Sequence, residues 1–266
     1  DDPEEERLYA VFEGLIGGQL MTWQGRSEAY TALSEPAAVA RHWGETVRND
    51  PTFTSSHLTV VFNEVVARHL FRQVLAGIVY LHELGFIHKD VKPDNIFLTL
   101  PVPVADARFA HLMNLSSWPS QVGRSAAPDV PVHPAMLSQS GFSAKLGDFN
   151  TAMAGVQPDC LVYDAEGTQQ FTPPECFCKQ RGVKGKPRDA WSLGVLLFTM
   201  LFGHCPFWAE AAIQLQLQII HEDVIVPRGG ASALAEDLIR LFLRKDPQER
   251  IVPATALDHG WMTALP

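Results

Sequence analysis

Hydrophobic residues recur at helical spacing in one long segment of the chain, between residues 63 and 84. One apolar residue follows another at steps of three or four along it, at Val66, Leu70, Val74, Ile78 and Leu81, and such steps place side chains on one face of a helix. Asn63 is a good N-cap residue, and Gly85 is placed to end the helix. The pattern predicts an amphipathic helix over residues 63–84.

The second half of the chain is also predicted to be mainly helical. Residues 190–203 are almost continuously apolar, which is too short a run to span a bilayer and indicates a buried core helix. Further helices are expected near residues 211–220, 234–243 and 253–257. Strand-like patterns are few, and the two clearest cover residues 8–12 and 143–146.

Two regions lack a consistent hydrophobic period, residues 24–60 and residues 100–141. The second is rich in Pro, Ser and Ala, a composition that favours loop over packed structure. We interpret both as insertions, and a small folded subdomain is the alternative for residues 100–141. The rest of the chain carries ordinary globular patterning.

Charge and cysteine content narrow the classes of function. The chain has 21 Lys and Arg against 30 Asp and Glu, a net charge of −9, which argues against binding nucleic acid through a basic surface. Four cysteines suit neither a disulfide framework nor a zinc site. The acidic start lacks the apolar run of a signal peptide, and no transmembrane segment is expected. A cytoplasmic or nuclear location fits best. Because the first residue is not Met, we expect a longer parent protein.

The most informative string is HKDVKPDN, residues 88–95. It contains the parts that phosphoryl transfer needs: a carboxylate at Asp90 to orient a hydroxyl, a cation at Lys92, and an amide oxygen at Asn95 for magnesium. A charged turn after a helix is the alternative. Asp148, which follows the strand-like segment 143–146, could supply a second magnesium ligand.

Further motifs follow in order along the chain. They read DFN at 148–150, GTQQFTPPE at 167–175, DAWSLG at 189–194 and DPQERI at 246–251. With HKDVKPDN, they make residues 8–262 resemble a protein kinase, specifically its large C-terminal lobe. The segments FGHCPF (202–207), EDL (236–238) and HGW (259–261) resemble calcium/calmodulin-dependent protein kinase kinases.

The resemblance implies an α+β, mainly α fold: a protein-kinase-like C-terminal lobe with a hinge strand and a small N-terminal lobe that is largely missing. The expected organisation of this partial kinase domain, 1–266, is a hinge region (8–18), an insertion (24–60), the long helix and catalytic loop (63–99), a second insertion (100–141), a magnesium-binding and activation segment (143–175), and a helical subdomain (176–266).

The resemblance also assigns roles by motif position. Catalysis is expected to involve Asp90 as the base, Lys92 as the cation near the γ-phosphate, and Thr168 as the residue that bonds to both. Asn95 and Asp148 would hold Mg²⁺. ATP would lie against the backbone of Glu13 and Leu15 and the side chain of Phe97. Structural roles are expected for His88 and Phe149 in a hydrophobic spine, for Asp189 as the anchor of the catalytic loop, and for a buried ion pair between Glu175 and Arg250.

The sequence departs from the family pattern at three points. Lys89 replaces an arginine that commonly contacts an activation-loop phosphate, and Asn150 replaces a glycine after Asp-Phe. No glycine-rich loop or strand lysine for the ATP phosphates is recognisable in the chain. We expect the acids Asp159, Asp164 and Glu166 to partner Lys89, so that activity depends little on phosphorylation of this loop.

These features predict an ATP- and Mg²⁺-dependent serine/threonine protein kinase. Its substrate would be a protein, and the resemblance suggests the activation loop of another kinase. The alternative is a pseudokinase that uses the lobe as a binding scaffold. Because the N-terminal lobe would be required for full activity, we expect the 266-residue chain to be inactive alone.

Overall fold

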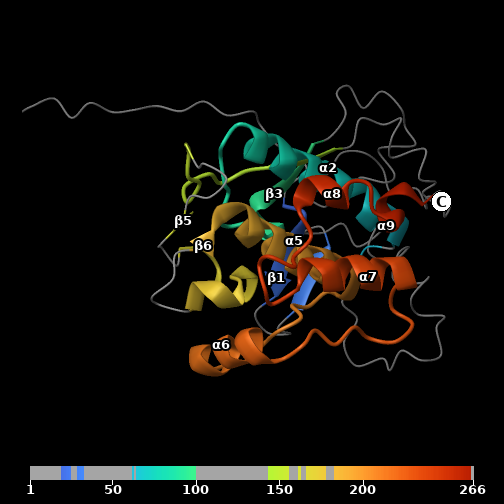
Figure 1. Ribbon diagram of the computed structural model, residues 1–266. Coiled ribbons are helices and arrows are strands. Elements are labelled where there is room, and N and C mark those ends of the chain that lie inside the picture. Colours follow the sequence, from blue (N-terminus) through green and yellow to red (C-terminus); the bar gives the residue numbers. More distant parts are fainter. Residues whose placement is uncertain are drawn as a thin grey trace, which may run out of the picture.

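The structure of the protein is a computed structural model that describes residues 19–24, 29–32, 62, 64–99, 143–155, 161–162, 166–177 and 183–264. Helices dominate the described residues (Figure 1), in agreement with the expected kinase-like, mainly helical fold. The hinge region 8–18, the proposed N-cap Asn63 and nearly all of both insertions lie outside the described residues. None of the described helices is both long and apolar enough to cross a membrane.

The predicted long helix is α2 (Glu64–Glu83). Its apolar stripe lies in the core, with Val66, Leu70, Val74 and Ile78 almost fully buried. The helix ends at Glu83, and Gly85 in the turn after it adopts φ 76°, a conformation that costs glycine little. The backbone N–H of Gly85 donates to the carbonyl of His82 (3.3 Å), so the predicted stop is confirmed.

Helix α5 (Gly185–Phe202) lies at the centre of the described structure (Figure 1). Every residue from Arg188 to Leu201 is buried, as expected for the continuous apolar run. The helix packs against both α2 and α7 (Ala233–Phe242). Gly194 permits the close approach of α7, because a Cβ atom at this position would come within 2.6 Å of the Cβ of Phe242.

The remaining predicted helices are present with small shifts of their ends. They are α6 (Ala212–His221), α7 and α8 (Pro253–Ala256), followed by the unpredicted α9 (Gly260–Thr263). Glu64 at the start of α2 joins these elements, since its carboxylate accepts hydrogen bonds from Ser232 N (2.9 Å) and from Trp261 Nε1 (2.6 Å). Short 3₁₀ turns η1 (Pro93–Asn95), η2 (Gln169–Phe171) and η3 (Pro174–Phe177) carry much of the intervening chain.

The strands form three antiparallel pairs among the described residues. They are β1 (Met21–Gln24) with β2 (Ala29–Ala32), β3 (Ile96–Thr99) with β4 (Ser143–Leu146), and β5 (Leu161–Val162) with β6 (Val183–Lys184). The predicted strand 143–146 is confirmed. We expected loop for residues 24–60, yet β2 lies there, and β3 was not foreseen. Both are four-residue strands, too short for a clear periodic signal.

The β1–β2 hairpin packs against η1 and the start of β3. The backbone N–H of Leu20 donates to the carbonyl of Ile96 (2.7 Å), and that of Tyr30 donates to the carbonyl of Gly203 at the end of α5 (2.6 Å). The hairpin therefore connects the start of β3 with the end of the central helix, and it brings Trp23 and Tyr30, which face each other across its two strands, close to η1.

Candidate active site

Asp189 anchors the segment that carries Asp90. Its fully buried carboxylate accepts hydrogen bonds from the backbone N–H groups of His88 and Lys89 (2.9 Å each), and it contacts His82 Nε2 at 2.8 Å. Burial alone would raise the pKa of Asp189, but the bond to His82 and the two backbone donors outweigh it and hold the pKa below its usual range. The predicted anchor is therefore present, and it holds Lys89 at φ 67°.

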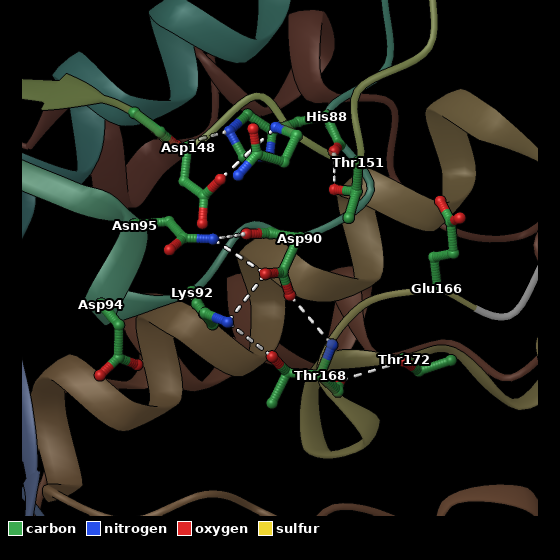
Figure 2. A network of polar contacts seen from close by, with 12 residues as sticks. His88, Asp90, Lys92, Asp94, Asn95, Asp148, Thr151, Glu166, Thr168 and Thr172 are labelled. Atoms are coloured by element: carbon green, nitrogen blue, oxygen red, sulfur yellow. Dashed lines mark hydrogen bonds and ion pairs between the residues drawn. The ribbon is translucent and has the colours of Figure 1, made fainter.

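The three expected catalytic residues meet in one network, shown in Figure 2. The backbone N–H of Thr168 donates to Oδ1 of Asp90 (2.9 Å), and Nζ of Lys92 lies 2.8 Å from Oδ2 of the same carboxylate. Lys92 Nζ also donates to the hydroxyl of Thr168 (2.8 Å). The Asp90 carboxylate is thus held by Lys92, from the loop after α2, and by Thr168, at the start of η2.

This network keeps Asp90 ionised. Its burial by itself would raise the pKa of Asp90, but the ion pair with Lys92 and the hydrogen bonds from Thr168 hold the pKa below its usual range. Asp90 is only 7% exposed, so its charge acts in an environment that screens it weakly. At neutral pH the side chain is a carboxylate, able to accept a proton or to orient a hydroxyl group.

Asn95 and Asp148 together suit a magnesium ion. The amide nitrogen of Asn95 donates both to the backbone carbonyl and to Oδ2 of Asp90 (2.9 Å each), and its oxygen accepts no hydrogen bond within the described part of the chain. In Figure 2 the exposed carboxylate of Asp148 projects toward Asn95. Two such oxygens fit Mg²⁺, which takes its other ligands from water and phosphates.

Asp148 rather than Asn150 has the unusual backbone. Asn150 replaces the family glycine, a residue often used where φ is positive. Of the described residues outside glycine, however, only Lys89 and Asp148 have positive φ (67° and 56°). Aspartate tolerates this region better than most residues. The departure at Asn150 therefore places no left-handed strain on the turn.

Phe97, which we expect to lie beneath the adenine, packs closely against Gly147. Phe97 faces Lys145 across the β3–β4 pair, and a Cβ atom on Gly147 would come within 2.7 Å of its ring, so only glycine allows this packing. Glu13 and Leu15, the expected hinge residues, lie outside the described residues.

The segment after Asp148 is tied to the catalytic loop through His88. The hydroxyl of Thr151 donates to the carbonyl of His88 (3.1 Å), and His88 Nε2 contacts the carbonyl of Gly147 (3.1 Å). The rings of His88 and Phe149 lie 5.1 Å apart, consistent with the expected spine. Phe149, however, is 43% exposed, so its outer face is not covered by the described residues.

Glu166 joins the activation segment to the catalytic loop. Its carboxylate lies 2.8 Å from Nζ of Lys89, which confirms one of the acidic partners expected for this lysine, while Asp159 and Asp164 lie outside the described residues. Arg188 donates to the backbone carbonyl of Glu166. Arg188 is not predictable from the sequence, because a lone arginine before the DAWSLG motif gives no signal that its side chain will be fully buried.

The predicted ion pair between Glu175 and Arg250 is present and bidentate, with N–O distances of 2.7 and 3.0 Å. The side chain of Arg250 is fully buried and that of Glu175 is 17% exposed. Arg250 also donates to the carbonyls of Pro187 (2.7 Å) and Arg244 (3.0 Å). This pair fixes the end of the activation segment against the helical subdomain.

Fold and site together define a protein kinase catalytic domain, and comparison with known proteins agrees. A family model described as protein kinase domain matches residues 42–126 and 128–262. The chain therefore belongs to the protein kinase family. Members of this family generally use ATP and Mg²⁺ and phosphorylate proteins.

Similar proteins are serine/threonine kinases. Serine/threonine-protein kinase GRIK1 of Arabidopsis thaliana is 30% identical over 99% of this chain and 48% of its own length. Calcium/calmodulin-dependent protein kinase kinase cmkC of Emericella nidulans is 29% identical over 76% of this chain and 32% of its own. Serine/threonine-protein kinase ssp1 of Schizosaccharomyces pombe is 27% identical over 98% of this chain and 30% of its own. The chain is thus related to calcium/calmodulin-dependent protein kinase kinases, and it spans half or less of the length of these relatives.

Proposed function

We propose that this chain is the phosphoryl-transferring part of a serine/threonine protein kinase. The observation that carries the proposal is the network around Asp90, in which a buried, ionised carboxylate shares Lys92 and Thr168 as partners. A charged turn after a helix would not need these long-range contacts. The same residues supply positioning and charge stabilisation, the two contributions on which phosphoryl transfer depends.

In the proposed reaction, bound ATP supplies the phosphoryl group, and bound Mg²⁺ offsets the charge of the phosphates. Asp90 orients the substrate hydroxyl and accepts its proton as the oxygen bonds to the γ-phosphorus and the bond to the ADP oxygen breaks. Lys92 offsets negative charge on the transferred group, and Thr168 holds Lys92 and Asp90 in register. Asn95 and Asp148 would hold the ion through their side-chain oxygens.

The nucleotide would lie against Phe97, with Glu13 and Leu15 as backbone partners of the adenine. Support for Phe97 comes from its position two residues after Asn95 and from the close packing of its ring against Gly147. The roles of Glu13 and Leu15 rest on motif position alone. The requirement for a further N-terminal lobe, and the inactivity of the 266-residue chain by itself, stay predictions.

The substrate we propose is the activation loop of another kinase, in the cytoplasm or nucleus. Support comes from relatedness to a protein named as a kinase kinase. A scaffold without catalysis is the second candidate, and it is favoured by Lys89, Asn150 and the exposed ring of Phe149. The intact set of Asp90, Lys92, Asn95 and Asp148 favours catalysis.

The test is Asp90→Asn in the natural full-length protein. The change preserves shape but removes the proton acceptor, so transfer of labelled phosphate from ATP to a protein substrate should fall roughly 10²–10⁴-fold. The control is Asp258→Asn, which alters an exposed carboxylate in the C-terminal part of the chain. Thermal melting should show that both variants remain folded.

Two outcomes would contradict the proposal. If Asp90→Asn retained full activity, Asp90 would not be the base. If the unaltered protein bound partners but transferred no phosphate to any of them, with Mg²⁺ and ATP present, the scaffold would replace the kinase.

A further inference from the structure

Helix α6 carries a sequence pattern that suits a strand better than a helix. Its sequence, AIQLQLQIIH, alternates strictly between apolar residues and glutamine from Ile213 to Ile219. Such alternation would place every apolar side chain on one face of a strand, because successive side chains of a strand point to opposite faces. In a helix, side chains two residues apart point about 200° apart, so the same sequence cannot form one apolar stripe.

The burial of the apolar side chains in α6 shows the result of this conflict. Leu215 and Ile219 are 3% and 0% exposed and lie in the core, whereas Ile213 and Leu217 are 66% and 49% exposed. The helix therefore divides its alternating apolar residues between two sides, one buried and one facing outward. Because residues four apart are neighbours on a helix surface, the two exposed side chains lie next to each other.

The two ends of α6 lack features that stabilise a helix. Ala211 occupies the N-cap position and makes no side-chain hydrogen bond to the first turn, although serine, threonine, aspartate and asparagine are the residues that cap a helix well. Glu222 and Asp223 directly follow the last turn, where the helix dipole disfavours negative charge. The helical form of α6 thus depends largely on its contacts with the rest of the protein.

Those contacts act mainly on the last turn of α6. The backbone N–H of Trp208 donates to Oε1 of Gln218 (3.1 Å), and Nζ of Lys245 donates to the carbonyl of Ile219 (2.6 Å). The helix also packs against η3, and in Figure 1 it lies at the edge of the described structure, apart from the other labelled helices. Local opening of α6 should therefore cost less than opening of α5, which is buried along most of its length.

The segment is also free of charged residues. Residues 211–221 contain no Asp, Glu, Lys or Arg and no Pro or Gly, and the flanking charges belong to Glu210 and Glu222. Uncharged segments of this kind can stack as strands on identical segments of other chains, because no charges repel one another and glutamine side chains form hydrogen-bonded ladders along the stack. As a strand, the segment would have one face of apolar residues and one of glutamines.

We propose that residues 213–219 are a self-association segment, which leaves its helical form and stacks as a β-strand on the same segment of other copies of this chain. The proposal does not depend on the kinase function proposed above. Stacking would bring together in one interface the four apolar residues that the helix divides between core and solvent. Glu210 and Glu222, one at each end of the segment, would oppose growth of the stack by like-charge repulsion.

The first test is Leu217→Lys in the natural full-length protein, incubated slightly below its melting temperature. Because Leu217 is 49% exposed, the change should keep the native helix, but it would place a charge at the same point of every stacked strand. The lag time before thioflavin T fluorescence rises should lengthen roughly tenfold or more.

The matched control is Ile225→Lys. Ile225 is 83% exposed and lies outside the segment, and the substitution makes the same change of charge, so the lag time should change by less than about twofold. An equal delay in both variants would overturn the proposal, because exposed apolar surface in general would then drive assembly.

The second test locates the strand without any substitution. In the assembled protein, hydrogen exchange should show protected backbone amides at residues 213–219, and in the monomer the same amides should exchange faster than those of α5. Fibre diffraction should show the spacing of about 4.8 Å between stacked strands.

Three other outcomes would overturn the proposal. One is an assembly in which the amides of residues 213–219 exchange freely. Another is a soluble dimer that keeps α6 helical and buries Ile213 and Leu217, because the exposed side chains would then serve helix packing rather than strand stacking. The third is a protein that stays monomeric throughout the incubation.

Discussion

Contacts with other residues hold Lys89 in a backbone conformation that lysine does not favour. Its φ of 67° lies in the left-handed region, which is costly for a lysine. Two features offset that cost: Asp189 accepts a hydrogen bond from its backbone N–H, and Glu166 binds its side chain at 2.8 Å. The side chain of Lys89 is only 5% exposed. Because the carboxylate that binds it belongs to an amino acid of the chain, the contact forms without an added phosphate.

Glu166→Gln tests this contact. The side chain of Glu166 is 59% exposed, so its loss should weaken ordering of the activation segment by only about 1 kcal/mol, and activity should fall roughly fivefold. Phosphatase treatment of the unaltered protein should leave activity unchanged. A loss of activity on phosphatase treatment, with Thr151 or Tyr163 phosphorylated beforehand, would contradict the prediction.

The residues that meet at the site were predictable where a motif carried them. The string HKDVKPDN located Asp90, Lys92 and Asn95, and GTQQFTPPE located Thr168. The side-chain contacts of Arg188 and Asp94 were not predicted, because they depend on which distant residues fold against them. Tyr30 holds Asp94 across 64 residues of sequence, and no local pattern reports such a partner.

At the scale of elements, the ion pair between Glu175 and Arg250 joins the activation segment to the helical subdomain. Arg250→Met should lower the free energy of unfolding by about 3–5 kcal/mol, because it leaves Glu175 without its partner and several carbonyls without a donor. Arg240→Met is the matched control, since Arg240 pairs with Glu236 but both side chains are over 40% exposed, and it should cost under about 1 kcal/mol. Urea unfolding would measure both, and equal costs would contradict the prediction.

Long elements were predictable, whereas most of the short strands were not. Helix α2 was predicted to within one residue at each end because its apolar stripe repeats over five turns. Strands β1, β2 and β3 have four residues each, and their pairing partners decide their structure more than their own composition. The hairpin was therefore hidden in a region whose sequence indicates loop.

For the whole molecule, we expect low pH to reduce the stability of the fold. The pKa values of three carboxylates lie below their usual range: burial opposes this at each, but hydrogen bonds and cations outweigh it. They are Glu64, Asp90 and Asp189. A lowered folded-state pKa means that the unfolded chain binds protons more readily, so the stabilisation is present above the unfolded pKa of about 4 and is lost as pH falls further.

We therefore expect the melting temperature to fall steeply below about pH 4. Glu64→Gln should lower stability at pH 7 and make the acid limb shallower, because Glu64 joins α2 to Ser232 and Trp261 and its own titration is then removed. Melting curves from pH 7 to pH 3 would show this. Parallel curves for the two proteins would mean that Glu64 does not contribute to the acid limb.

The contact between Lys89 and Glu166 has a further consequence for signalling. A phosphate is added by one enzyme and removed by another, so a loop held by phosphate stores a record of recent events. A loop held by a carboxylate stores none, because the charge is renewed only when the protein is synthesised. The activation segment of a kinase built in this way would be held at all times, so this one contact would act as a constant rather than as a switch.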